Sequence, residues 1–324
     1  MDKKIIDFYK QTSQFTYLGK YKEEAIDLWE NKCQKSLKNL CLYLMNTTIH
    51  RVLIQKTLDG ANLKDYGDFD FVDYKTPMCE DDSFLTATSM FSEIYRRDSK
   101  GFYIGRPISK RLIVTCRYVS VLTSAILKAN GIPCRSRAGW AKYLRPTAIL
   151  DHWVNEYYNE DEKRWIMFDM DDLYDADFAD YKLYRENNIA TEYLDLGPNQ
   201  FCTASEAWLN YRKDAHNIDK FVYSPSSCIP REVLKYLFLD FMSIMNFEPN
   251  YKFIPMAFDK DFNTLTEKEL AEVNYLATLM QDVDKNFDKL KELFDNTPKY
   301  RMLNSPLVSK EDFTQLINKK EYKI

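Results

Sequence analysis

The stretch LIVTCRYVSVLTSAILKANGIPCRSRAGW, residues 112–140, restricts the fold of this chain more than any other part of the sequence. Within it, Val119, Leu122, Ile126 and Leu127 recur at the spacing of one helical face. A helix with an apolar face is stable only when that face is buried against another element. We therefore expect a helix here that packs against the β-rich sequence following it.

The sequence also predicts where this helix begins and where it ends. Thr115 is a suitable N-cap, which makes Cys116 the first helical residue. Gly131 stands just past the last turn, where a left-handed residue is favoured, and Pro133 blocks continuation of the helix. The pattern predicts a helix that begins at a cysteine and ends at a glycine.

Three β-rich runs follow, at residues 135–144, 151–158 and 164–170, and turns separate them. Helical patterns lie on both sides of these runs, with a predicted helix at 84–97 on the N-terminal side and a Gly- and Asp-rich loop at 58–77. On the C-terminal side helices are predicted at 203–213, 231–245 and 266–294. The fold class is therefore α+β, with a small antiparallel sheet packed against the cysteine-bearing helix and flanked by N- and C-terminal helices.

The 324 residues suit a single domain, because no linker rich in Pro, Gly or Ser marks a boundary. We divide it into an N-terminal helical part (1–97), a core (98–175) and a C-terminal helical part (176–324). The formal net charge is −4 and no basic stripe is present, so nucleic acid is not an expected partner.

Compartment and membrane contact are predicted from two further features. The N-terminal sequence lacks a secretory signal, and the most apolar stretch, 236–247, is too short to span a bilayer. The seven cysteines have no regular spacing, which favours free thiols in a reducing environment. We expect a cytoplasmic protein without membrane contact, and the oligomeric state stays open.

Cys116 is the candidate nucleophile. A helix N-terminus carries free N–H groups and the positive end of the dipole, which favour a thiolate and an oxyanion beside it. The alternative is that Cys116 is a small buried hydrophobic residue, which is the commoner use of cysteine. A nucleophilic role requires a base, and the base requires a group that orients it.

The chain contains three histidines, His50, His152 and His216, and His152 begins the second β-rich run. If that run and the next form a hairpin centred between Glu160 and Asp161, His152 lies directly opposite Asp169, on the same face. The pair then has the arrangement that fixes an imidazole tautomer. The alternatives are a histidine satisfied by packing at a strand end and an aspartate in a solvated acidic loop.

These residues resemble the transglutaminase-like superfamily. The resemblance rests on the helix-start cysteine, the G-I-P turn at 131–133, and the motifs R-x-R-A-G-W, D-H-W-V-x-E-Y and R-W-x-x-x-D, and it covers residues 112–172. It implies a papain-like core with the triad Cys116, His152 and Asp169. It also implies a side-chain oxyanion donor located upstream of the cysteine, which the sequence does not identify.

The segments 201–214, 269–283 and 295–302 resemble a bacterial subgroup of that superfamily whose members are mostly cytoplasmic and whose substrate is undefined. The first hundred residues carry no comparable motif.

The predicted function is that of an enzyme in which a cysteine attacks an amide or ester carbonyl and forms a thioester. Transfer of the acyl group to water makes it a hydrolase, and transfer to an amine makes it an acyltransferase; the alternative is an inactive binding module with the same core. A peptide, protein or small amide is the expected substrate, and no cofactor or metal is expected, since no metal-binding spacing is present. Five residues are candidate substrate contacts, with ordinary ion pairs and packing as their alternative: Arg117, Arg135, Arg137, Tyr143 and Trp153.

Overall fold

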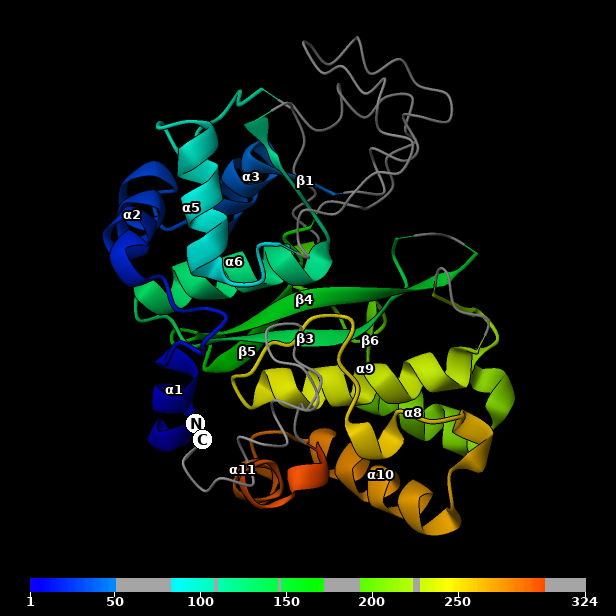
Figure 1. The fold of residues 1–324 in the computed structure, drawn as a ribbon. Coiled ribbons are helices and arrows are strands. Elements are labelled where there is room, and N and C mark those ends of the chain that lie inside the picture. The colour runs from blue at the N-terminus through cyan, green and yellow to red at the C-terminus, as the bar shows by residue number, and fades with distance from the viewer. Residues whose placement is uncertain (51–82, 108–109, 145–146, 172–192, 224–227, 301–324) are drawn as a thin grey trace, which may run out of the picture.

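The computed structural model describes residues 1–50, 83–107, 110–144, 147–171, 193–223 and 228–300. The chain has an α+β fold in which helices cover both faces of a curled, mostly antiparallel sheet (Figure 1). Helix α6 (Cys116–Ala129) lies on one face, and α9 (Ile229–Ile244) lies on the other. The predicted fold class is confirmed, while the predicted loop at 58–77 falls outside the described residues.

Helix α6 has the ends that the sequence predicts. Asn130 is its C-cap and Gly131 follows with φ of 72°, a conformation that suits glycine because it has no Cβ. The N–H of Ile132 donates to the carbonyl of Leu127 at 3.0 Å, and that of Gly131 donates to Lys128 at 3.0 Å. These two bonds form a Schellman motif, which turns the chain directly into the first long strand of the sheet.

The main sheet follows the order β5-β4-β3-β6, with β7 paired to β4 in parallel. The strands are β3 (Cys134–Ala141), β4 (Ile149–Asn159), β5 (Arg164–Phe168), β6 (Phe201–Thr203) and β7 (Phe221–Val222). Gly139 of β3 lies where a Cβ would come within 2.4 Å of the Cys202 carbonyl oxygen. The close approach of β6 to β3 therefore depends on the absence of a side chain at this position.

The β4–β5 hairpin has a register different from the one we predicted. Asn159 pairs with Arg164 and Asn155 pairs with Phe168, so the turn is centred one residue later than expected. Partners are therefore displaced by two residues, and Asp169 follows the end of β5 instead of pairing with His152. A displacement of two residues leaves each side chain on its predicted face, because strand side chains alternate with a period of two.

The N-terminal part is helical and adds a short second sheet. Among the described residues its helices are α1 (Lys3–Lys10), α2 (Lys22–Asp27), α3 (Leu37–Thr47) and α5 (Ala87–Arg97). Strand β1 (Thr48–His50) pairs in parallel with β2 (Leu112–Val114), which ends just before α6. This pairing brings His50, at the end of β1, to the start of the cysteine-bearing helix.

The C-terminal part packs below the sheet in Figure 1 and consists of α8 (Ala204–Lys213), α9, α10 (Glu267–Met280) and α11 (Phe287–Asn296). Thr266 and Glu269 form a capping box at the start of α10. The pattern predicted as one helix over 266–294 is interrupted by a turn, in which Asp284 accepts hydrogen bonds from Trp165 and Arg135. Short single turns lie at Gly19–Tyr21, Leu28–Lys32, Ala215–Ile218, Met256–Phe258, Phe262–Thr264 and Pro298–Tyr300.

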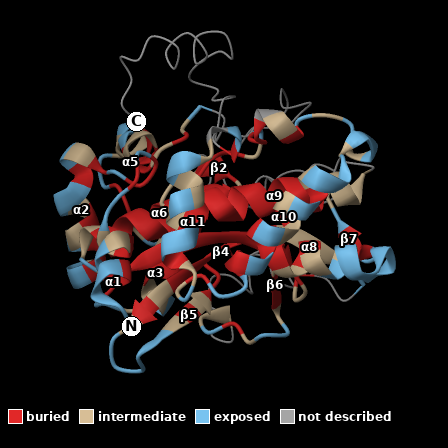
Figure 2. Cartoon of the chain, turned by 90° about the horizontal axis from the view of Figure 1, so that it is seen from below, coloured by how far each residue is buried: buried red, intermediate tan, exposed pale blue. Residues whose placement is uncertain are grey.

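The sheet separates two apolar clusters. One is built around α6 with α2, α3 and α5, and the other around α9, α8 and α10 with α1. Figure 2 shows α6, α9 and β4 as the buried centre, with exposed surface on outer elements such as α2 and α11. Cys116, at the start of α6, is thereby enclosed between the sheet and loops from both helical parts.

Candidate active site

Cys116 is the first residue of α6, and only 5% of it is exposed. Thr115 is the N-cap by its extended backbone, but in the described part of the chain its side chain makes no capping bond to the helix. The Tyr251 hydroxyl is found there instead, accepting from the Arg117 N–H at 3.1 Å and lying 2.9 Å from the Cys116 Sγ. A tyrosine from the C-terminal part therefore contacts both the thiol and a free amide of the helix N-terminus.

His152 of β4 and Asp169 form a fully buried pair. The Nε2 of His152 lies 2.9 Å from the Asp169 Oδ2, and neither side chain is exposed. Asp169 also accepts from the Tyr143 hydroxyl at 2.7 Å and from the Asp171 N–H at 2.9 Å. The alternative of a solvated acidic loop does not hold for Asp169 and Asp171, which are both buried; residues 172–180 lie outside the described part.

The other ring nitrogen of His152, Nδ1, is buried and makes no hydrogen bond with any residue that the structure describes. The thiol of Cys116 and this imidazole are nevertheless close enough for each to change the pKa of the other. Loose geometry of this kind is usual for a nucleophile and its base without substrate. The three residues of the predicted triad therefore lie together.

Burial dominates the electrostatics of the thiol. It raises the pKa of Cys116, and the nearby His152 lowers that pKa by a smaller amount. The lowered thiol pKa expected from the helix N-terminus is therefore not found, because desolvation of the thiolate outweighs it. Burial also lowers the pKa of His152, but Asp169 and then Cys116 raise it by more, so that it lies well above 6.5.

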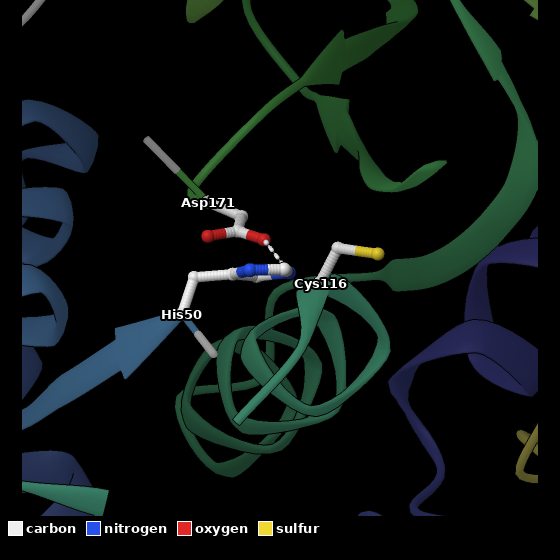
Figure 3. Close-up of side chains that lie close together, drawn as sticks. All are labelled: His50, Cys116 and Asp171. Carbon is white, nitrogen blue, oxygen red and sulfur yellow. Dashed lines mark ion pairs between the residues drawn. The ribbon is translucent and has the colours of Figure 1, made fainter. Parts of the chain in front are cut away.

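A second imidazole–carboxylate pair lies close to the thiol of Cys116. The Nε2 of His50 is 3.5 Å from the Asp171 Oδ2, and both side chains are 6% exposed. Donor atoms of His50, Asp171 and Cys116 all lie within 4.8 Å of one another. Figure 3 shows His50 at the end of β1 and Asp171 after β5 paired with each other beside the start of α6, with the Cys116 sulfur directed away from them.

Sequence reasoning did not place His50 or Asp171 in the site. His50 lies in the site because β1 pairs with β2. In this pairing His50 is opposite Val114, which is two residues before Cys116. The available signal was weak: a histidine at the end of a short β-branched run, and a second aspartate two residues after Asp169. Tyr251 had no sequence signal at all.

The five residues considered as substrate contacts have different surroundings. Tyr143 bonds Asp169 and lies edge-on to the His152 ring, with the ring centroids 6.3 Å apart. Trp153 is buried against Tyr251, with the ring centroids 6.2 Å apart. These two aromatic residues therefore lie beside the triad.

The three arginines are engaged with other protein groups. Arg117 is buried and donates to three carbonyl oxygens, those of Leu85, Glu248 and Pro249. Arg137 bonds Asp240 and Glu156.

Arg135 bonds Glu156 and Asp284. Arg135 and Arg137 also line a cavity of about 350 Å³ beside Gln281, and its lining does not include Cys116 or His152. The ion pairs that we considered as the alternative for Arg135 and Arg137 are thus present.

Fold and site together define a class of protein: an α+β chain with a cysteine at a helix start and imidazole–carboxylate pairs beside it. Residues 110–170 match the family model described as transglutaminase-like superfamily, so this segment is a transglutaminase-like core. No curated protein and no solved structure matches the chain. Within the described residues, no helix has the length and apolar character needed to cross a membrane. The family and the site support a cysteine-based enzyme.

Proposed function

We propose that this protein transfers acyl groups from an amide or ester through a thioester on Cys116. One observation carries the proposal: in the fully buried His152–Asp169 pair Nε2 and Oδ2 lie 2.9 Å apart, which leaves Nδ1 of His152 available to the nearby thiol of Cys116. An imidazole held by a carboxylate on one nitrogen and facing a nucleophile with the other has the geometry of a general base. Cys116 is then the nucleophile, His152 the base and Asp169 the orienting residue.

The proton moves within this arrangement. His152 Nδ1 takes the proton of the thiol as sulfur attacks the carbonyl carbon, and the carbonyl π electrons move to oxygen. The intermediate collapses when the C–N or C–O bond breaks and the leaving group takes the proton from His152. Water or an amine then attacks the thioester, gives its proton to His152 and releases the thiol.

Asp169 is well placed to hold the ring through these steps. It accepts from His152, Tyr143 and the Asp171 N–H, so its carboxylate is fixed by three donors. Its charge stabilises the imidazolium that forms during the attack. The raised pKa of His152 agrees with this role.

The oxyanion is expected at the start of α6, where the backbone N–H of Cys116 is one donor. The Tyr251 hydroxyl occupies the Arg117 N–H and contacts Sγ, so a substrate carbonyl has to displace it to reach the sulfur. Displacement would release the Arg117 N–H as a second donor beside the reacting carbon.

The residues of the triad do not distinguish hydrolase from acyltransferase, because access of water or amine decides the acceptor. We keep both within the proposal. Incubation with a peptide library or cell extract, followed by mass spectrometry of the intact protein, tests it directly. An acyl adduct on Cys116 is expected, absent in Cys116→Ser, and its mass names the acyl donor class.

A binding module without turnover is the second candidate, and the enclosure of the thiol favours it. Cys116 is 5% exposed and in contact with Tyr251. The two candidates differ in reactivity: iodoacetamide should modify Cys116 at a rate that falls when His152 is replaced by Ala. His216→Ala is the matched control, since His216 pairs with Asp219 at 3.0 Å on the surface. A rate equal in all three proteins would favour the binding module.

A further inference from the structure

His50 and Asp171 lie close to Cys116, but the proposed reaction does not require them. The reaction needs one imidazole and one carboxylate at the thiol, and the His152–Asp169 pair supplies both. His50 and Asp171 add a second nitrogen and a second carboxylate within 4.8 Å of the sulfur and of each other.

The chemistry of these donors matches a thiophilic divalent cation. Zinc takes thiolate sulfur at about 2.3 Å and imidazole nitrogen or carboxylate oxygen at about 2.0–2.2 Å, in tetrahedral sites. Ligand atoms of such a site lie roughly 3.2–3.8 Å apart by simple geometry. The distance of 3.5 Å between His50 Nε2 and Asp171 Oδ2 falls in that range and is longer than a normal hydrogen bond.

The elements that carry the donors are fixed by the fold. His50 ends β1, which is paired with β2, and Cys116 starts α6 directly after β2. Asp171 is tied through its N–H to the Asp169 carboxylate at 2.9 Å. The three donor atoms lie within 4.8 Å of one another, so rotation of the side chains, above all of Cys116, has to bring them to the shorter spacing of a coordinated ion.

The neighbouring pair is a poorer ligand set. Asp169 accepts from His152, Tyr143 and the Asp171 N–H, so a metal ion there would compete with three donors for the carboxylate oxygens. The carboxylate of Asp171 and the imidazole of His50 meet each other at the longer distance of 3.5 Å. The cation is therefore expected on His50 and Asp171.

We propose that the Cys116 Sγ, the His50 Nε2 and the Asp171 carboxylate form a binding site for one divalent cation of the zinc type. A thiolate and a carboxylate offset the two positive charges, the imidazole is neutral, and water takes the fourth position. Binding displaces the thiol proton to solvent. The occupied site withdraws the sulfur from attack, so the cation acts as a reversible inhibitor; this consequence alone rests on the proposed function.

The test uses the full chain and Co²⁺, which reports thiolate coordination by a sulfur-to-metal charge-transfer band. Titration is expected to produce that band at one equivalent, and Zn²⁺ should compete it away. Cys116→Ser should abolish the band. Because loss of outer-shell partners already costs about 10–100-fold in metal affinity, His50→Gln and Asp171→Asn are expected to weaken binding by about 100-fold or more.

Two controls make the outcome decisive. His216→Gln removes an exposed histidine of another imidazole–carboxylate pair and should leave the affinity unchanged. His152→Gln should change the affinity far less than His50→Gln. Absence of the band, or a loss of affinity caused by His152→Gln and not by His50→Gln, would overturn the proposal.

Separate measurements distinguish a loss of cation binding from a loss of folding or of activity. Circular dichroism of each variant checks that it is folded, and protection of Cys116 from iodoacetamide by Zn²⁺ in the unmodified protein needs no variant. Failure to protect the thiol counts against the site. An acyl adduct without cation binding would leave the proposed function intact, and cation binding without an adduct would leave this site intact.

Discussion

Two imidazole–carboxylate pairs meet at Cys116, and they differ in how the fold holds them. His152 lies in β4 and Asp169 directly follows the neighbouring strand β5; both side chains are fully buried, and Nε2 and Oδ2 lie 2.9 Å apart. His50 and Asp171 come from the edge of the N-terminal part and from the chain after β5, and they lie 3.5 Å apart. A tightly bonded pair suits repeated proton transfer, whereas a looser pair can accommodate an ion between its members.

The largest expected difference between the pairs concerns the reactivity of the thiol. General-base catalysis is worth about 100- to 10,000-fold, so His152→Ala should slow acylation of Cys116 by that order. His50→Ala is expected to slow it about tenfold or less. Rates measured with an activated ester under single-turnover conditions check this. Equal losses in both variants would remove the distinction between the pairs.

The carboxylates give a second comparison. Asp169→Asn keeps the shape but replaces the charge that raises the pKa of His152, so we expect a loss of acylation of about 100-fold or more. Asp171→Asn keeps its N–H bond to Asp169 and should cost much less. The pH dependence of the rate should move in Asp169→Asn, and an unmoved profile would count against the orienting role.

A substitution at Gly139 is expected to disturb the His152–Asp169 pair, although Gly139 is not a member of it. It pairs with His152 across β3 and β4, and a Cβ there would meet the Cys202 carbonyl oxygen at 2.4 Å. Overpacking of this kind costs about 1–3 kcal/mol, so Gly139→Ala should lower the free energy of unfolding by that amount. Urea denaturation measures it. Gly105→Ala is a poor control because its φ is 81°, whereas Gly197→Ala, with no positive φ, is suitable.

The charge of His152 also predicts how stability depends on pH. Its folded-state pKa is raised above 6.5, so its contribution to stability is complete below about pH 6.5 and is lost as the pH rises through the folded pKa. The difference in unfolding free energy between the parent and His152→Gln should therefore shrink toward alkaline pH. A difference that grows with pH would show that the imidazole is neutral in the folded protein.

The smallest expected effect is that of Tyr143→Phe, which removes one of three donors to Asp169. A single hydrogen bond to a charged group is worth about 1.5–3 kcal/mol, and the remaining donors keep the carboxylate in place. We expect acylation to slow by roughly tenfold at most, with the unfolding free energy lowered within that range. A loss as large as that of His152→Ala would indicate that Tyr143 acts directly on the substrate.

Much of the fold was predictable because its signals are local. The ends of α6 follow from Cys116 and Gly131, and the alternation of β4 and β5 kept Asp169 on the correct face although the predicted register was displaced by two residues. A register error of two residues does not change the face of a side chain, because side chains return to the same face at every second residue. The turn between α10 and α11 was missed because its apolar and charged residues continue the helical pattern.

The sequence by itself determined the helix that begins at Cys116, the strands that follow it and the face on which His152 and Asp169 lie, because capping, periodicity and alternation act between near neighbours. Only the tertiary structure decided that His50, Asp171 and Tyr251 also surround the sulfur. His50 and Tyr251 reach the site through the β1–β2 pairing and the packing of the C-terminal part, which join residues far apart in the chain. Contacts between residues far apart in the chain depend on how much surface whole helices and strands bury together. No short sequence motif predicts such contacts.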